Sequence, residues 1–176
     1  MARISLIEEK EHPELADLIA TLRSGRGGEL LNIYRLLLHA PRLAATWFEH
    51  FNAVRWQTEI AGRLRELLII RIARLNRSEY VIRQHVPRLA QAEGLSAQEC
   101  DALADWKASA FFDERERAAL AFADEMSSGE VADATFVDLR RHFSERQAVE
   151  LAVLVGTYNM HNRVFAALKI DLEAAR

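Results

Sequence analysis

Two residues of the sequence have types and spacing that could support acid/base chemistry. Glu66 opens a run of mostly apolar residues that ends at Leu75. A second helical pattern begins at Ser78 and carries His85 on its apolar stripe, because spacings of three and four place residues on one face of a helix. We therefore expect Glu66 and His85 to meet where these two helices pack together.

A Glu–His pair of this kind has a structural and a catalytic interpretation. In the structural one, the carboxylate satisfies an imidazole in the core and holds two helices together. In the catalytic one, His85 is a general acid/base, because the pKa of histidine lies near neutrality, and Glu66 is a base with a raised pKa. Arg63 and Arg74 are close enough in sequence to compete for the carboxylate of Glu66. Spacing alone favours the structural interpretation.

The spacing around this pair forms a longer motif. Glu66 is followed after twelve residues by Ser78, after three more by Val81 and after four more by His85. This pattern resembles the carboxymuconolactone decarboxylase and alkylhydroperoxidase D-like (AhpD-like) family, whose peroxidase members read Glu…Cys-x-x-Cys-x-x-x-His. Here the two cysteine positions hold Ser78 and Val81. Similar flanking segments lie at 32–41, 92–96 and 150–160, so the resemblance covers about residues 30–170.

This resemblance implies a fold and a class of reaction. The expected fold is all-α and AhpD-like, one domain over residues 1–176, assembled as a homotrimer or homohexamer and working without a cofactor. The expected activity is that of a lyase similar to carboxymuconolactone decarboxylase, acting on a small acidic lactone or a related intermediate of aromatic degradation. The alternatives are alkylhydroperoxidase-type activity and a degenerate, non-catalytic helical oligomer. With this resemblance, the catalytic and the structural interpretations of His85 and Glu66 have about equal support.

The two altered positions remove the thiol chemistry that the resemblance would otherwise imply. In peroxidase members the second cysteine lies one turn before the histidine, which takes the thiol proton. Val81 has no thiol, and Ser78 lies seven residues from His85, about 10 Å along a helix axis. That separation is too long for a nucleophile–base pair, so Ser78 is expected to be the N-cap of its helix. Cys100, without a partner, is expected to be inert.

If the chain is a decarboxylase, further residues should face the substrate. His85 would deliver a proton to carbon while the glutamate sets the tautomer of the imidazole. Arg71 or Arg163 would hold the substrate carboxylate. Tyr80 and Tyr158 are predicted as substrate-binding residues at the pocket, although spacing favours packing at a subunit boundary for Tyr80. The polar group from Tyr158 to Arg163 is interpreted as an interhelical hydrogen-bond network, with a second wall of the pocket as its alternative.

The elements that must position these residues all read as helices. Helical patterns cover 13–23, 29–39, a segment from 41, 62–75, a segment from 78, and the segments that begin at about 96, 113, 133 and 144. Asp113 and Asp133 are expected N-caps, and capping boxes are expected at 96–99 and 144–147. Pro87 should kink its helix near Arg83. Five aromatic residues are expected to be exposed and to suit a subunit interface: Tyr34, Trp47, Phe48, Phe51 and Trp56.

Composition narrows the class of protein. A chain of 176 residues with 50% hydrophobic residues can bury the core of one domain. Its net charge of -3 gives no reason to expect a nucleic acid or a membrane as partner. The six histidines form no paired helical site, so no metal is predicted. A single cysteine and the lack of a signal-like N-terminal segment predict a cytoplasmic protein.

Overall fold

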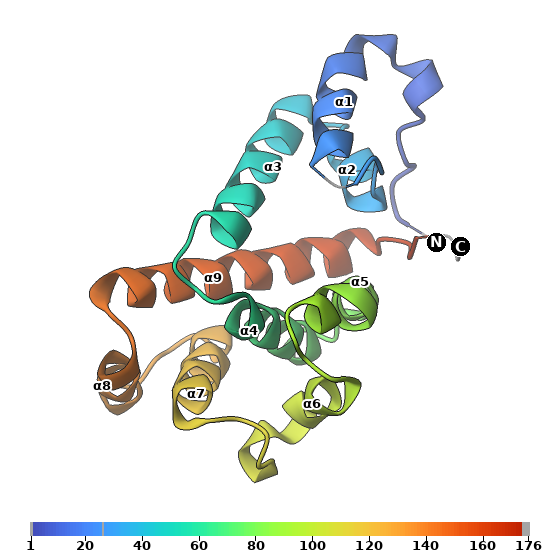
Figure 1. Cartoon of the computed structure of the whole chain (residues 1–176). Coiled ribbons are helices and arrows are strands. Elements are labelled where there is room, and N and C mark those ends of the chain that lie inside the picture. The colour runs from blue at the N-terminus through green and yellow to red at the C-terminus, as the bar shows by residue number, and fades with distance from the viewer. Residues whose placement is uncertain (1, 26, 174–176) are drawn as a thin grey trace. The chain divides into compact units, whose positions relative to one another are not determined.

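The computed structural model describes residues 2–25 and 27–173, and these contain helices but no strand. The predicted all-α class is therefore confirmed. The described residues form two compact units. Unit 1 consists of the residues up to 53 together with those from 165 onward, and unit 2 consists of residues 54–164. Figure 1 follows the helices along the chain. The single domain expected over residues 1–176 stays a prediction.

Unit 1 is built from short helical elements. These are the 3-10 turns η1 (Glu9–Glu11) and η2 (Pro13–Leu15), α1 (Ala16–Ser24), α2 (Asn32–Leu37), and α3 (Pro41–Trp56) as far as residue 53. Pro13 opens η2, which α1 follows directly, as expected of a residue whose φ suits the first turn of a helix. Helix α2 begins at Asn32 rather than at the predicted Glu29, because Gly27 and Gly28 have positive φ and Leu31 is extended.

Three of the five aromatic residues that were expected to be exposed lie in the core of unit 1. Tyr34, Phe48 and Phe51 are 3%, 8% and 3% exposed, and Tyr34 meets Phe48 edge-on with 5.9 Å between ring centroids. The expectation was wrong for these three because α2 and α3 each contribute aromatic side chains to the same core. Trp47 stacks on Phe51 at 5.3 Å, while Trp56 is 56% exposed. The homo-oligomer stays a prediction.

Unit 2 surrounds helix α4, which spans Gly62–Leu75 as predicted. Nine of the fourteen residues of α4 are buried, as a central helix requires. It packs against α5 (Glu79–Gln84), the π-helical turn η3 (His85–Ala90), the 3-10 turn η4 (Leu103–Ala108) and α7 (Glu114–Ser128). Helix α8 (Asp133–His142) packs on α7, and α6 (Ala97–Ala102) packs on η3 and η4. The remaining helix, α9 (Glu145–Leu168), belongs to unit 2 as far as residue 164.

Capping residues explain where several of these helices begin. Ser96 and Asp113 each form a full capping box, with Glu99 and Glu116 respectively, and Ser144 and Gln147 exchange equivalent bonds. One further cap was predicted wrongly, and another was predicted at the right position. Ala132 occupies the N-cap position that was expected for Asp133. Ser78 does occupy the N-cap of α5, but its side chain makes no capping hydrogen bond.

The turn at Pro87 fixes where His85 sits. Helix α5 ends at Gln84 and continues as the π-helical turn η3, which contains Pro87. Proline has no N–H to donate to the preceding turn, and π-turns accommodate such a local break within a helix. A kink was predicted near Arg83; the structure instead changes from α-helix to π-helix at His85, the junction of the two elements. Among residues 2–25 and 27–173, every helix is too short or too polar to span a bilayer.

Candidate acid/base site

Glu66 and His85 meet inside unit 2. Glu66 lies one turn into α4 and is 0% exposed, and His85 lies at the junction of α5 and η3 and is 6% exposed. The Oε2 atom of Glu66 is 2.6 Å from Nδ1 of His85. The expected contact between the two helices is therefore present. Whether the pair is catalytic stays a prediction.

The positive charges beside Glu66 come from two arginines that sequence reasoning did not select. Nη2 of Arg55 lies 3.3 Å from Oε1 of Glu66, and Nε of Arg65 lies 3.7 Å from the same oxygen. The expectation that Arg63 and Arg74 compete for this carboxylate was wrong. Arg63 binds the two capping glutamates of α6 and α7 at 2.6 and 2.8 Å, and Arg74 pairs with the aspartate of α6 at 3.1 Å.

Arg55 and Arg65 also enclose an exposed aromatic ring. Their guanidinium carbons lie 4.7 and 4.6 Å from the ring centroid of Trp56, within the range of cation–π attraction. Arg65 is held further by Glu93 at 2.7 Å and by the carbonyl oxygen of Arg55 at 2.9 Å. The Nε atoms of both arginines are buried without a hydrogen-bond partner in the part of the chain that the structure describes. The cluster thus keeps donor capacity that its own carboxylates leave unused.

The electrostatics of the pair define its resting protonation state. Burial acts to raise the pKa of Glu66, but the hydrogen bond from His85 and the charges of His85, Arg55 and Arg65 outweigh it, and the pKa is lowered. Burial lowers the pKa of His85 despite the opposing hydrogen bond and charge of Glu66, and the charges of Arg55 and Arg65 lower it further. At neutral pH the pair is therefore a carboxylate beside a neutral imidazole.

The carboxylate fixes the tautomer of His85. An ionised Glu66 can only accept hydrogen bonds, so Nδ1 of His85 must carry the proton and donate it. The lone pair of the imidazole is then on Nε2, which has no hydrogen-bond partner among residues 2–25 and 27–173. A neutral imidazole in this state is a proton acceptor at Nε2. The arrangement is equipped to take a proton first and return it afterwards.

Of the other predicted site residues, Tyr158 reaches the pair. Its ring, 1% exposed, stands edge-on to His85 with 6.0 Å between centroids. Tyr80 is buried at 6% exposure on α5. Arg71 does not turn toward the pair, because Asp124 binds its guanidinium through two contacts of 2.6 and 2.9 Å. Arg163 is exposed on α9. The substrate-binding roles of these four stay predictions.

The two positions that hold cysteine in peroxidase members, Ser78 and Val81, are buried and carry no thiol. Ser78 is 8% exposed and Val81 is 1% exposed. The one cysteine of the chain, Cys100, lies on α6 and is 0% exposed. Burial, with the charges of Asp101 and Glu99, raises the pKa of its thiol. A raised pKa keeps the thiol protonated and unreactive.

The polar group on α9 forms a network within unit 2. Asn159 accepts a hydrogen bond from Asn76, after α4, at 2.9 Å and donates one to Ser127 of α7 at 2.8 Å. Asn162 donates to the carbonyl oxygen of Tyr158 at 2.8 Å. Asn159 thereby ties three segments together, which fits the interhelical network. The expected link between Tyr158 and Asn162 runs through the backbone of Tyr158 rather than through its side chain.

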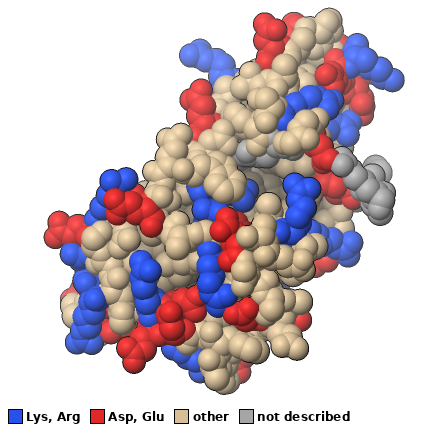
Figure 2. Space-filling model, in the orientation of Figure 1, with Lys and Arg blue, Asp and Glu red and all other residues tan. Residues whose placement is uncertain are grey.

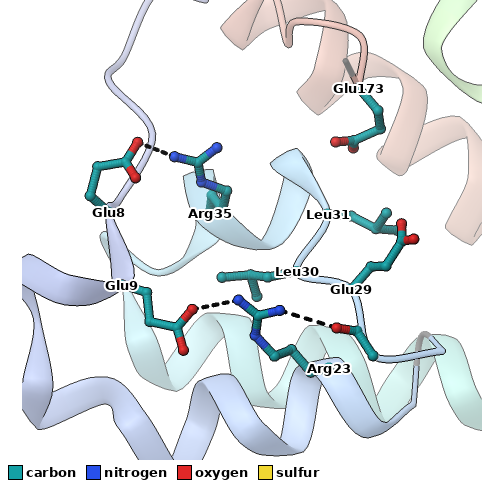
Figure 3. A pocket seen from close by; sticks show the side chains of 9 residues that line it. Glu8, Glu9, Arg23, Glu29, Leu30, Leu31, Arg35 and Glu173 are labelled. Atoms are coloured by element: carbon teal, nitrogen blue, oxygen red, sulfur yellow. Dashed lines mark hydrogen bonds and ion pairs between the residues drawn. The ribbon is translucent and has the colours of Figure 1, made fainter. Parts of the chain in front are cut away.

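A cavity of about 440 Å³ in unit 1 offers no comparable chemistry. Figure 3 shows its two arginines occupied by neighbours: Arg35 pairs with Glu8, and Arg23 lies between Glu9 and the carbonyl oxygen of Gly28. On the outer surface, basic and acidic side chains are interspersed over the face that Figure 2 presents. That pattern agrees with the small net charge of the chain. The pair in unit 2 is thus the strongest candidate for chemistry.

Residues 41–125 match the family model described as the Carboxymuconolactone decarboxylase family. Over this segment the chain is similar to the carboxymuconolactone decarboxylase family. The segment contains both members of the buried pair, Glu66 and His85, together with the altered positions Ser78 and Val81. The family resemblance drawn from the sequence is confirmed.

Relatives of known sequence or structure extend this match. The uncharacterized protein YdfG of Bacillus subtilis is 29% identical over 115 residues, which are 64% of this chain and 78% of that protein. The AhpD core of an uncharacterized peroxidase-related protein from Ralstonia eutropha superimposes with a TM-score of 0.82 at 21% identity, covering 98% and 92% of the two chains. The debrominase Bmp8, bound to 2,3,4-tribromopyrrole, gives 0.81 at 23% identity and covers 99% and 95%. At these identities the structural likeness establishes the AhpD-like fold.

Sequence reasoning missed Arg55, Trp56 and Arg65. Helical spacing within α4 indicated Arg63 and Arg74, three and eight positions from Glu66. Spacing within one helix does not identify a neighbour that another helix contributes. Arg55 comes from the end of α3, ten residues before Arg65. The one available signal was the adjacency of Arg65 and Glu66, two charged residues together in a helix that is otherwise apolar on most sides.

Proposed function

We propose that this chain is a cofactor-free acid/base enzyme in which His85 moves a proton and Glu66 holds His85 in its working tautomer. The observation that carries the proposal is the 2.6 Å contact between Oε2 of Glu66 and Nδ1 of His85. A buried carboxylate on one imidazole nitrogen orients the ring and leaves the other nitrogen for the substrate, as in other acid/base sites built on histidine.

The substrate class we propose is a small acidic lactone or a related carboxylated intermediate. Arg55 and Arg65 support this choice, because their guanidiniums lie beside the pair and the Nε of each makes no hydrogen bond in the described part of the chain. Positive charge at this place would stabilise the negative charge that develops on an enolate oxygen. Arginine also binds carboxylates in a planar, directional way.

The resting state of His85 decides between two versions of the reaction. In an isomerisation, neutral Nε2 removes a proton from a carbon next to a carbonyl, and the imidazolium returns that proton to another carbon of the enolate. In a decarboxylation, the carboxylate leaves as CO2, the electrons of the broken C–C bond form the enolate, and an imidazolium that has taken its proton from solvent protonates the carbon. The first version needs neutral His85 and the second needs its protonated form.

These two versions differ in their expected pH dependence. Because the pKa of His85 is lowered from its usual value of 6.5, isomerisation should be fully active at neutral pH and should fall as His85 becomes protonated. Decarboxylation should rise with acidity over the same range. A rate profile for each reaction, on one lactone acid, separates them.

A non-catalytic helical oligomer is the second candidate, and the burial of the pair favours it. Glu66 is 0% exposed and His85 is 6% exposed, so the contact could serve only to hold α4 against the α5–η3 junction. Peroxidase activity is the weakest candidate, since Ser78 and Val81 supply no thiol and Cys100 is buried with a raised pKa.

The test uses a panel of γ-lactone carboxylic acids in D2O, with NMR detection of deuterium uptake at carbon and of CO2 release. His85→Gln should lower the rate by roughly 10²–10⁴-fold while circular dichroism shows the same helix content. Glu66→Gln should lower it as well. The exposed variant Glu79→Gln, away from the pair, serves as control. Full activity in both pair variants would overturn the proposal in favour of a structural pair.

A further inference from the structure

A second cavity of about 440 Å³ lies in unit 2, at the C-terminal end of α4. We call it the α4 groove. Residues of α4, the following turn, α5 and η4 line it, among them Arg71, Arg74, Leu75, Arg77, Glu79 and Ile82. Neither Glu66 nor His85 is among the lining residues. Its volume falls in the range of pockets that hold small molecules, and three of its six named lining residues are arginines.

The arginines of the α4 groove differ in the hydrogen bonds and ion pairs that they make with other residues of the protein. Asp124 neutralises Arg71 through two short contacts. Arg74 contacts the carbonyl oxygen of Cys100 and the largely exposed Asp101 at 3.1 Å, but its Nε is buried without a hydrogen-bond partner in the described part of the chain. A buried donor left unpaired costs about 1–3 kcal/mol. Arg74 therefore has one guanidinium nitrogen that makes no hydrogen bond to the described residues.

Arg77 has fewer contacts with other charged or polar groups than Arg71 and Arg74. It is exposed, and its guanidinium makes no hydrogen bond or ion pair with residues 2–25 or 27–173. The one carboxylate among the lining residues, that of Glu79, is bound to Arg83 at 2.7 Å, and Arg83 does not line the groove. Arg77 thus remains available to an anion, while Arg74 shares its guanidinium with Asp101, whose side chain is 83% exposed.

Arg77 also occupies an unfavourable backbone position. The N–H groups of Arg77 and Ser78 bond to the carbonyl oxygens of Arg74 and Ala73, the pattern of a helix end that usually carries glycine at this place. Arg77 has φ +54°, the left-handed region that costs a side-chain-bearing residue on the order of 1 kcal/mol. Attraction to the helix C-terminus offsets part of this cost. Lys169, with φ +49° at the end of α9, shares this geometry but does not line the groove.

We propose that the α4 groove binds a small organic phosphate. A carboxylate is satisfied by one guanidinium, whereas the three terminal oxygens of a phosphate monoester can accept from two. Arg74 and Arg77 would bind the phosphate, with Arg71 as a fixed wall. Leu75, which is 40% exposed, and Ile82 would contact the apolar part of the ligand. This site is independent of the acid/base pair and of the reaction proposed for it.

Isothermal titration calorimetry with phenyl phosphate, inorganic phosphate and benzoate tests the proposal. The wild-type chain should bind phenyl phosphate most tightly, inorganic phosphate more weakly because it lacks the apolar part, and benzoate at least about tenfold more weakly, the equivalent of one charge-assisted contact. Equal binding of phenyl phosphate and benzoate would overturn the choice of phosphate. Failure of phenyl phosphate to bind would overturn the site.

Two glycine variants separate binding from backbone strain. Arg77→Gly and Lys169→Gly both relieve a left-handed residue, so both should keep or raise the Tm. Arg77→Gly should weaken phenyl phosphate binding by about tenfold or more, and Lys169→Gly should leave it unchanged. Arg74→Gln, which keeps a polar side chain in the wall, should also weaken binding. The same affinity in the Arg77 and Lys169 variants would contradict the proposal. A His85→Gln variant should retain full binding, which keeps this test separate from that of the acid/base reaction.

Discussion

Glu66 and His85 are nineteen residues apart in the sequence and share a hydrogen bond of 2.6 Å. The two carboxylate oxygens of Glu66 have different partners: Oε2 accepts from the imidazole, while Oε1 faces Arg55 at 3.3 Å. One buried charge therefore sets the tautomer of a histidine and balances a guanidinium at the same time. A substitution of His85 or of Arg55 should therefore affect the other residue through Glu66.

Glu66→Gln should destabilise unit 2 strongly. The amide would leave the nearly buried guanidinium of Arg55 without the negative charge that now faces it, while Arg65 would keep its ion pair with Glu93. Breaking a buried ion pair in this way costs about 3–5 kcal/mol. Urea unfolding followed by circular dichroism measures the loss. Glu79→Gln, which breaks an ion pair whose partners are 62% and 63% exposed, should change the unfolding free energy by less than about 1 kcal/mol.

Stability should fall in acid in two stages. The pKa of His85 is lowered from 6.5 in the folded protein, so the unfolded chain binds the proton first and stability declines as the pH drops below about 6.5. The pKa of Glu66 is lowered from 4.5 and that of Glu99 is lowered to about 2, so a second decline begins below about 4.5. His85→Gln should remove the first stage and retain the second. Urea midpoints from pH 7.5 to pH 3 give the comparison, and an unchanged slope above pH 4.5 in the variant would count against this account.

Arg55→Gln should raise the pKa of His85. The positive charge of Arg55 is one of the factors that lower this pKa, and removing it makes protonation of the imidazole easier. Titration of the histidine ring resonances by NMR measures the direction of the change. Arg83→Gln, whose guanidinium pairs with Glu79 on the surface, is the matched control and should leave the titration of His85 where it is in the wild-type chain.

Hydroperoxide reduction should not depend on the single cysteine. Cys100 is buried, and the pKa of its thiol is raised, so little reactive thiolate forms at neutral pH. With thiol or lipoyl reductants, the wild-type chain should show no more turnover than Cys100→Ser. Robust turnover that disappears in the serine variant would show that thiol chemistry has been retained by another route.

Local signals in the sequence were sufficient for much of the fold. The bounds of α4 follow from its dense apolar pattern, and the starts of α6 and α7 follow from Ser96 and Asp113, because a cap is a contact within four residues. The meeting of Glu66 and His85 could also be predicted, since both lie on apolar faces of consecutive helices. These features depend on short stretches of chain.

Features that depend on distant segments were not predictable in this way. Arg63 reaches the capping glutamates Glu99 and Glu116, more than thirty residues away, and so leaves Glu66 to Arg55. The burial of Tyr34 and Phe48 likewise depends on how α2 and α3 pack. A periodic pattern identifies the face of a helix that is buried, but it does not say which side chain of another helix will lie against it.

The position of Trp56 gives the protein an intrinsic optical probe. Its indole is 56% exposed and lies within 4.7 Å of the guanidiniums of Arg55 and Arg65, which also border the carboxylate of Glu66. Indole emission responds to nearby charge and to contact with solvent. Protonation of the cluster, or a molecule resting on the ring, should therefore change the fluorescence without any added label, and Trp56→Phe would identify the part of the signal that comes from this ring.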